Sequence, residues 1–199
     1  VPYGGALIYL VIGERRIGDQ RRRRIDRMRS DYLPLRQVVI EQGIASVDWD
    51  RHGPAMKLLD RLGYNLVGIP TVRESHCEIL SETPAILKGI CEDIDTAQHS
   101  VLMEFYIWNE GGLADEVLAA VIRAAQRGVS CRVLIDAVGA GPWWKGAQPQ
   151  QTRDAGVRLE AALPVGLFRT FVGRTDLRIH RKIVVVDAQV AWTGSMNLV

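Results

Sequence analysis

Apolar and polar residues follow one another in blocks that predict alternating strands and helices over the carboxyl-terminal two thirds of the chain. Short apolar runs, rich in β-branched residues, predict strands at Cys77 to Leu80, Val101 to Trp108, Val129 to Val138, from Val157, Ile183 to Val186 and Val190 to Thr193. Apolar positions repeating every three or four residues predict helices from Thr83, from about Leu113 to Arg127 and near Gln148 to Ala155. This alternation indicates an α/β fold, a βαβ sheet with helices on its faces.

Two local signals mark helix ends in this region. Thr83 is suited to cap a helix whose first position is Pro84, because proline lacks the N–H that the first turn leaves unbonded. Gly128 is suited to end the helix that precedes it. Before this region, Pro54 to Leu62 predicts a short helix stopped by Gly63, and Tyr64 to Ile69 predicts an extended piece.

The first thirteen residues are uncharged and mostly apolar, and an arginine-rich stretch follows them. Crossing a bilayer takes about 20 apolar residues, so residues 1–13 are too few to span it alone. Because the chain begins with Val1, these residues are interpreted as the end of a transmembrane helix. Eight arginines and three acidic residues lie between Glu14 and Arg29, which suits a cytoplasmic, lipid-facing flank over residues 14–30. A buried strand followed by a solvated basic helix is the alternative. A nucleic-acid patch is a third reading, but the stretch has no interleaved aromatic residues.

Charge and cysteine content count against a nuclease and against a metal site. The net charge of the whole chain is +2, so the part beyond the arginine-rich stretch is mildly acidic and lacks the basic groove expected of a nuclease. The three cysteines, Cys77, Cys91 and Cys131, have no metal-ligand spacing and indicate ordinary thiols in a reducing compartment. No metal and no cofactor are expected. The predicted organisation is therefore a membrane-segment end (1–13), a basic stretch (14–30), an irregular linker (31–75) and a catalytic part (76–199).

The most informative segment is the pattern H-x-K-x4-D-x6-G-S-x-N near the carboxyl terminus, formed by His180, Lys182, Asp187, Gly194, Ser195 and Asn197. An imidazole and an ammonium two residues apart on a strand point to the same face, which would hold a nucleophile beside a phosphate-binding cation. The unbroken β-branched run that follows suits a strand buried on both faces. Asp187 begins an expected turn, and Gly194 allows a bend that presents Ser195 and Asn197 to an anion.

Other polar and aromatic residues lie where a βαβ sheet gathers ligands, beyond the carboxyl ends of its strands. Asp136 and the loop from Gly139 to Trp144 occupy one such end. Trp143 and Trp144 either face lipid or cover the edge of the core. Glu104, inside an apolar strand, either bonds within the site or emerges at an edge.

The carboxyl-terminal pattern resembles the HKD motif of the phospholipase D superfamily, and the chain as a whole resembles the amino-terminal half of bacterial cardiolipin synthases. The likeness extends to the apolar opening V-P-Y-G-G-A-L-I-Y-L-V-I-G-E and to V-L-M-E-F-Y-I-W and A-A-Q-R-G-V-S-C-R-V-L-I-D-A-V-G. The fold that the resemblance implies is a phospholipase D-like βαβ sandwich half-domain, a mixed sheet flanked by helices. Ile179 departs from the pattern, because these enzymes commonly carry Asn before the histidine.

The resemblance implies a phosphatidyl transferase that makes cardiolipin from phosphatidylglycerol at the inner membrane of a bacterial cell, with its catalytic part in the cytoplasm. His180 would attack phosphorus, Lys182, Ser195 and Asn197 would bind the phosphate, and Asp187 would mainly anchor the hairpin. A second HKD half, in the same chain or in a second subunit, would supply the general acid, so the 199 residues alone are expected to be inactive. The alternatives are a hydrolytic phospholipase D or nuclease, or an inactive membrane-associated remnant.

Overall fold

The computed structural model describes residue 5, residue 23 and residues 34–45, 47–73, 75–164 and 178–199. The chain divides into two compact units, Val1–Ile79 and Leu80–Val199. The expected end of a transmembrane segment and the basic stretch after it fall almost wholly outside the described residues. Within the part that is described, no helix is both long and apolar enough to cross a bilayer.

The described part of the first unit is helical at residues 34–41, in the short 3-10 helix η2 (Trp49–Arg51) and in α3 (Pro54–Val67). The prediction that a helix stops at Gly63 was wrong, because α3 continues through Gly63 and ends at Gly68, which has a φ of 82°. Glycine inside a helix costs only about 1 kcal/mol relative to alanine, and the flanking leucines and tyrosine continue the apolar face. The extended piece expected at Tyr64 to Ile69 is therefore the last turn of α3 and its cap.

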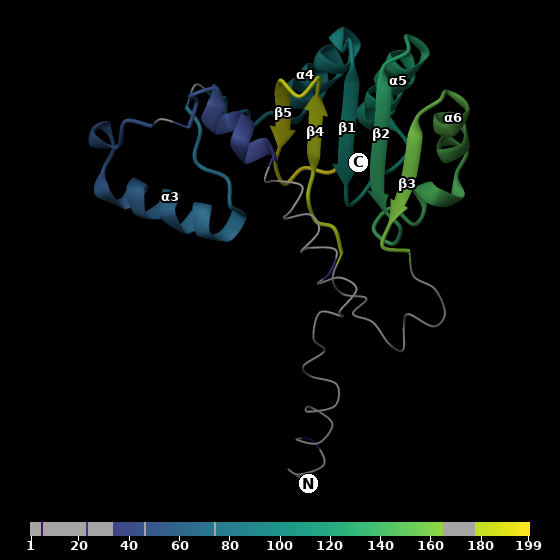
Figure 1. Ribbon diagram of the computed structural model, residues 1–199. Coiled ribbons are helices and arrows are strands. Elements are labelled where there is room, and N and C mark those ends of the chain that lie inside the picture. Colours follow the sequence, from purple (N-terminus) through teal and green to yellow (C-terminus); the bar gives the residue numbers. More distant parts are fainter. Residues whose placement is uncertain (1–4, 6–22, 24–33, 46, 74, 165–177) are drawn as a thin grey trace. The chain divides into compact units, whose positions relative to one another are not determined.

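The second unit is a five-stranded mixed sheet in the order β3-β2-β1-β4-β5 (Figure 1). Its strands are β1 (Ser100–Phe105), β2 (Ser130–Asp136), β3 (Arg158–Ala162), β4 (Ile183–Val186) and β5 (Val190–Thr193). Its helices are α4 (Thr83–Thr96), α5 (Gly112–Gln126), the 3-10 helix η3 (Trp143–Lys145) and α6 (Gln148–Asp154). The strands β1, β2 and β3 run parallel, and β4 and β5 are antiparallel to their neighbours, which confirms the expected mixed α/β sheet.

Two details within residues 77–83 differ from the predictions. Cys77 to Leu80 form no strand; these residues are exposed and have no partner strand to satisfy their backbone groups. Glu82 is the N-cap of α4 and Thr83 is its first residue, so the threonine side chain does not cap the helix, although proline does lie in the first turn.

The core lies between one face of the sheet and the helices α4 and α5, which Figure 1 shows behind the sheet. Alternate residues of β1 point into it, and Val101, Met103 and Phe105 are almost fully buried. Helix α5 meets them with residues one turn apart, including Val117 and Val121, each without exposed surface. The βαβ crossovers β1–α5–β2 and β2–α6–β3 therefore account for most of the core.

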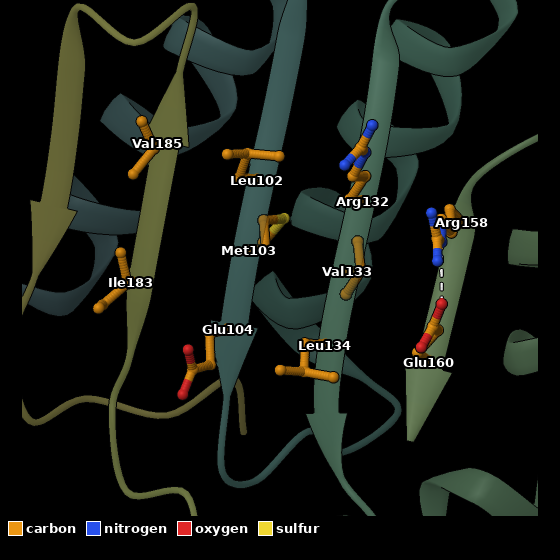
Figure 2. A pocket seen from close by; sticks show the side chains of 10 residues that line it. All are labelled: Leu102, Met103, Glu104, Arg132, Val133, Leu134, Arg158, Glu160, Ile183 and Val185. Carbon is orange, nitrogen blue, oxygen red and sulfur yellow. Dashed lines mark hydrogen bonds and ion pairs between the residues drawn. The ribbon is translucent and has the colours of Figure 1, made fainter. Parts of the chain in front are cut away.

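The opposite face of the sheet is open along its central strands. Figure 2 shows Leu102, Leu134, Ile183 and Val185 along a groove on this face, with charged side chains at its margins. Leu102 is 42% exposed, and the burial of β4 alternates between buried and half-buried residues. The interpretation of this strand as buried on both faces was therefore wrong, because the described helices α4 and α5 cover one face only.

The strand directions bring the segment before β4 to the carboxyl ends of the parallel strands. Because β4 is antiparallel to β1, its first residue, Ile183, pairs with Glu104 near the end of β1. The last residue of β2, Asp136, lies at the same edge, since Phe105 pairs with Ile135. Residues 178–182 therefore reach the sheet at the edge where ligands collect in folds of this kind.

Candidate functional site

His180 and Lys182 lie side by side immediately before β4. The Lys182 ammonium nitrogen Nζ is 3.3 Å from His180 Nδ1 and donates to the His180 carbonyl oxygen at 2.9 Å. Lys182 is only 5% exposed, whereas His180 is exposed to solvent. A nearly buried cation is thus held at the base of an accessible imidazole, an arrangement suited to an anionic ligand.

Tyr106, which directly follows β1, forms the aromatic wall of this pair. Its ring centroid is 4.9 Å from that of His180, and the Lys182 ammonium lies 5.6 Å from the tyrosine ring centroid. The electron-rich face of the ring favours the buried ammonium electrostatically. Sequence analysis did not single out Tyr106, because the contact depends on β4 pairing with β1 across more than 70 residues.

Asn197 reaches the same edge through the carboxyl-terminal tail. Leu198 is fully buried and forms a parallel bridge with Trp108, while its carbonyl accepts from the Asn109 N–H at 2.8 Å. This pairing lets Asn197 Oδ1 accept a hydrogen bond from the Ile107 N–H at 3.1 Å, one residue from Tyr106. The amide oxygen is used by the backbone, so the NH₂ is the group left to donate to an anion. Ser195 is exposed in the preceding turn.

Asp187 lies at the opposite end of β4 from His180, where it caps the start of β1. Its carboxylate accepts hydrogen bonds from the N–H groups of Gln98 at 2.8 Å, His99 at 2.8 Å and Ser100 at 2.7 Å. These backbone bonds lower the pKa of Asp187 below its ordinary value. The carboxylate therefore stabilises the junction of the hairpin with β1 and has no contact with the imidazole.

Asp136 and Arg178 form a buried ion pair at the same edge of the sheet as His180 and Lys182. Arg178 Nε donates to both Asp136 carboxylate oxygens at 3.0 Å, and Nη2 donates to Oδ1 at 2.6 Å. The aspartate side chain is 0% exposed and the arginine side chain 11%. Burial acts to raise the pKa of Asp136, but hydrogen bonds from Arg178 and from the N–H groups of Gly139 and Val138 leave it lowered overall.

The neighbouring pair, Arg181 with Glu104, is exposed. Arg181 Nε lies 3.0 Å from Glu104 Oε1, with the arginine side chain 67% exposed and the glutamate 17%. Of the two positions considered for Glu104, it thus emerges at the margin of the open face rather than within the site. An exposed pair of this kind contributes about 0–1 kcal/mol to stability.

Trp143 and Trp144 cover the edge of the core. Trp143 is 1% exposed and its ring centroid lies 5.5 Å from that of Trp108, while its indole N–H donates to Gln148 Oε1 at 2.6 Å. The Trp144 indole donates to the Asp136 carbonyl at 3.1 Å. With both indoles bonded inside the unit, the interpretation of these residues as lipid-facing is not supported.

This edge of the sheet thus offers an imidazole, an ammonium and an amide beside a tyrosine ring. Among the described residues, no group of three His, Cys, Asp or Glu side chains is placed to hold a metal ion. The residues that sequence analysis left open or missed are Tyr106, Asp136 and Arg178. Their contacts join distant segments, and the only sequence signals for them were the position of Asp136 at a strand end and the place of Arg178 two residues before the histidine.

Comparison with known proteins gives consistent matches. Residues 90–199 match the family model described as cardiolipin synthase, PLD-like domain. The whole chain is 38% identical to cardiolipin synthase A of Serratia proteamaculans (strain 568) and 32% identical to cardiolipin synthase A of Escherichia coli O1:K1 / APEC. It spans 40% of the length of each of these curated relatives. Among solved structures, Nuc of Salmonella typhimurium, a phospholipase D family member, is similar with a TM-score of 0.41 and 22% identity, over 56% of this chain and 64% of that one.

Proposed function

Because the chain belongs to the cardiolipin synthase, PLD-like domain family, we propose that it supplies one half of the active site of a phosphatidyl transferase. The reaction would move a phosphatidyl group from phosphatidylglycerol to the hydroxyl of a second phosphatidylglycerol, giving cardiolipin and free glycerol. The observation that carries the proposal is the exposed His180 imidazole 3.3 Å from the nearly buried Lys182 ammonium.

In the first step, a ring nitrogen of neutral His180 attacks the phosphorus of the donor lipid. A P–N bond forms, the P–O bond to the glycerol headgroup breaks, and the leaving oxygen takes a proton from a general acid. In the second step, the acceptor hydroxyl attacks phosphorus, the P–N bond breaks and the acceptor's proton returns to the acid. The covalent intermediate divides one difficult displacement into two easier ones.

Charge at the phosphate is met by groups that the fold holds in place. Lys182, packed under the imidazole, faces the non-bridging oxygens as negative charge grows on them. The Asn197 amide NH₂ adds a hydrogen bond, supported by the fixed position of its oxygen on Ile107. Ser195 adds a second donor from the exposed turn. No metal or cofactor has a role in this scheme.

The general acid would come from a second HKD half, in the same chain or in a second subunit. Two features support this division. The described residues around His180 offer lysine and tyrosine but no second imidazole in contact with it. The relatives are also longer, since this chain spans 40% of their length. The site of action would be the cytoplasmic membrane, where both lipid substrates are dissolved.

The decisive experiment follows the fate of labelled phosphatidylglycerol. The intact protein in detergent–lipid micelles is expected to form labelled cardiolipin and release glycerol, and His180→Ala is expected to reduce the rate to background. Protein denatured rapidly in detergent at mildly alkaline pH, where a P–N bond survives, should carry a labelled phosphatidyl group on the peptide that contains His180. His99, exposed at the opposite edge of the sheet, provides the matched control as His99→Ala.

Each alternative has a distinct outcome in the same assay. Phosphatidic acid without cardiolipin would assign the protein to hydrolysis. Cleavage of single-stranded DNA faster than of lipid would favour a nuclease. No turnover and no labelled peptide from the intact protein would leave an inactive membrane-associated remnant.

A further inference from the structure

The ion pair between Asp136 and Arg178 joins the end of β2 to the segment that carries the reactive imidazole. Arg178 lies two residues before His180, and 42 residues of chain separate it from Asp136. The three hydrogen bonds between them hold the guanidinium in one orientation, because Nε and Nη2 both donate to the carboxylate. Such a contact fixes the position of the backbone at Arg178 more closely than a single exposed ion pair does.

The same carboxylate also holds the loop that follows β2. Asp136 Oδ1 accepts hydrogen bonds from the N–H groups of Val138 and Gly139, both at 2.9 Å. Gly139 in turn lies against Tyr106: a Cβ added to it would fall 2.6 Å from the tyrosine ring atom Cε2 and would also collide with the Tyr106 carbonyl. The loop is therefore held where only a residue without a side chain leaves room for the tyrosine.

Tyr106 closes the arrangement, because its ring contacts both members of the reactive pair. The Tyr106 ring centroid lies 4.9 Å from the His180 ring centroid and 5.6 Å from the Lys182 ammonium nitrogen. Asp136 thus acts on the reactive pair by two routes, through Arg178 along the chain and through Gly139 and Tyr106 across the strand ends.

We propose that Asp136 and Arg178 are positioning residues, which hold the imidazole of His180 in its reactive placement without touching the substrate. This inference rests on the proposed function for its kinetic test, and it has a second test that needs no activity. Burial supports it, since a carboxylate without exposed surface and an arginine 11% exposed have little access to a lipid phosphate. A misplacement of about 1 Å at a reacting group can cost roughly 100-fold in rate, so such a pair matters to catalysis without contacting the reacting atoms.

The kinetic test uses Arg178→Gln and Arg178→Lys, with Arg181→Gln as the matched control. Arg181 lies in the same segment and forms the same kind of ion pair, but at an exposed site. For both Arg178 variants, kcat is expected to fall about tenfold or more while KM changes by less than about twofold, because placement and not binding is lost. Arg181→Gln is expected to keep both constants. A raised KM at unchanged kcat would mean that Arg178 binds substrate directly, which would overturn the proposal, as would wild-type kinetics.

The second test measures the environment of the imidazole without turnover. Diethyl pyrocarbonate modifies neutral, accessible imidazoles, and peptide mass spectrometry gives the rate at each histidine of the intact protein. In Arg178→Gln the rate at His180 is expected to change by about threefold or more, because the ring leaves Tyr106, while the rate at His99 stays constant. Equal His180 rates in the wild type and the variant would refute a positioning role even if the protein proved to be a hydrolase.

Folding is controlled separately. Arg178→Gln leaves a buried carboxylate without its cation, so the neutral double variant Asp136→Asn/Arg178→Gln is measured beside it. The double variant is expected to keep a cooperative thermal transition and still show the kcat loss and the altered His180 modification. Recovery of wild-type kcat in the double variant would show that the single variants failed through stability alone, and the proposal would fall.

Discussion

The carboxylate of Asp187 accepts a hydrogen bond from the N–H of Ser100 at 2.7 Å, although 87 residues separate the two. The bond joins the turn after β4 to the first residue of β1, and the N–H groups of Gln98 and His99 bond the same carboxylate. The acid of the HKD motif is therefore part of the framework that sets where β4 begins and ends. His180 precedes the other end of the same strand, whose first residue, Ile183, pairs with Glu104 of β1.

Replacing Asp187 by asparagine is expected to lower the melting temperature most at neutral pH. The folded state lowers the pKa of Asp187 below 3.8, so its contribution to stability is present above that pH and is lost as the pH falls through the folded-state pKa. The difference in melting temperature between wild type and Asp187→Asn should narrow as the pH falls below about 4. A difference that is constant from pH 7 to pH 3 would show that the ionised carboxylate is not what stabilises the junction.

Ala188→Gly is expected to stabilise the protein. Ala188 has a φ of 56° and Asp187 a φ of 51°, the left-handed region in which a Cβ costs about 1–2 kcal/mol. Part of this gain is offset by the greater freedom of glycine in the unfolded chain, which leaves about 0.5–1 kcal/mol. Denaturant unfolding measures the change. Ala191→Gly in β5 is the control and should destabilise; equal effects at the two positions would contradict the strain at Ala188.

Removing the ammonium of Lys182 is expected to abolish most of the activity without unfolding the protein. Lys182→Met should lower kcat by about 100-fold or more, because charge developing on the phosphate loses its nearest cation. Lys182→Arg should recover little, since the site is nearly closed and built for a compact ammonium. Lys88→Met, at a lysine 77% exposed in an ion pair with Glu92, should retain wild-type kinetics. If Lys182→Met retained its kcat, Lys182 would not be the group that stabilises the charge on the phosphate.

The exposed Cys77 and the buried Cys131 are expected to differ sharply in reactivity. Burial raises the pKa of the Cys131 thiol to about 11, so only ~0.1% is thiolate at pH 8. Cys77 is exposed and should react readily with iodoacetamide, whereas Cys131 should not. Peptide mapping after brief alkylation of the native protein tests this order. Cys131→Ser should leave turnover largely intact; fast alkylation of Cys131 would mean that the core opens on that timescale.

Local sequence patterns predicted those elements whose formation depends on residues close together in the chain. The run Ile183 to Val186, a turn of three residues and the return from Val190 match β4, its turn and β5. The helices of the second unit follow their apolar periodicity, as α5 does with Val117 and Val121 buried one turn apart. Local signals misled at Gly63, because glycine is tolerated inside a helix when the apolar face continues. They also misled at Cys77 to Leu80, which form no strand, and at Thr83, which is the first residue of α4 and not its cap.

Contacts that depend on topology could not be predicted in this way. The partners Asp136 and Arg178 are 42 residues apart, and nothing local in either indicates the other. Tyr106 joins the reactive pair only because β4 runs antiparallel beside β1, a pairing that no sequence pattern here specifies. Likewise, the unbroken apolar run Ile183 to Val186 predicted a strand buried on both faces. Such a run does not indicate how many faces of the sheet other elements cover.

The open face of the sheet also bears on how the second unit should be handled in the laboratory. Leu102 on β1 and Leu134 on β2 line the groove on this face, with Arg158 and Glu160 on the neighbouring β3, as Figure 2 shows. Apolar side chains are exposed on this face, and association between copies through it would compete with solubility. Leu102→Thr replaces an exposed apolar side chain with a less apolar one that is favoured in strands. The variant should reduce association between copies and leave the edge with His180 and Lys182 unchanged.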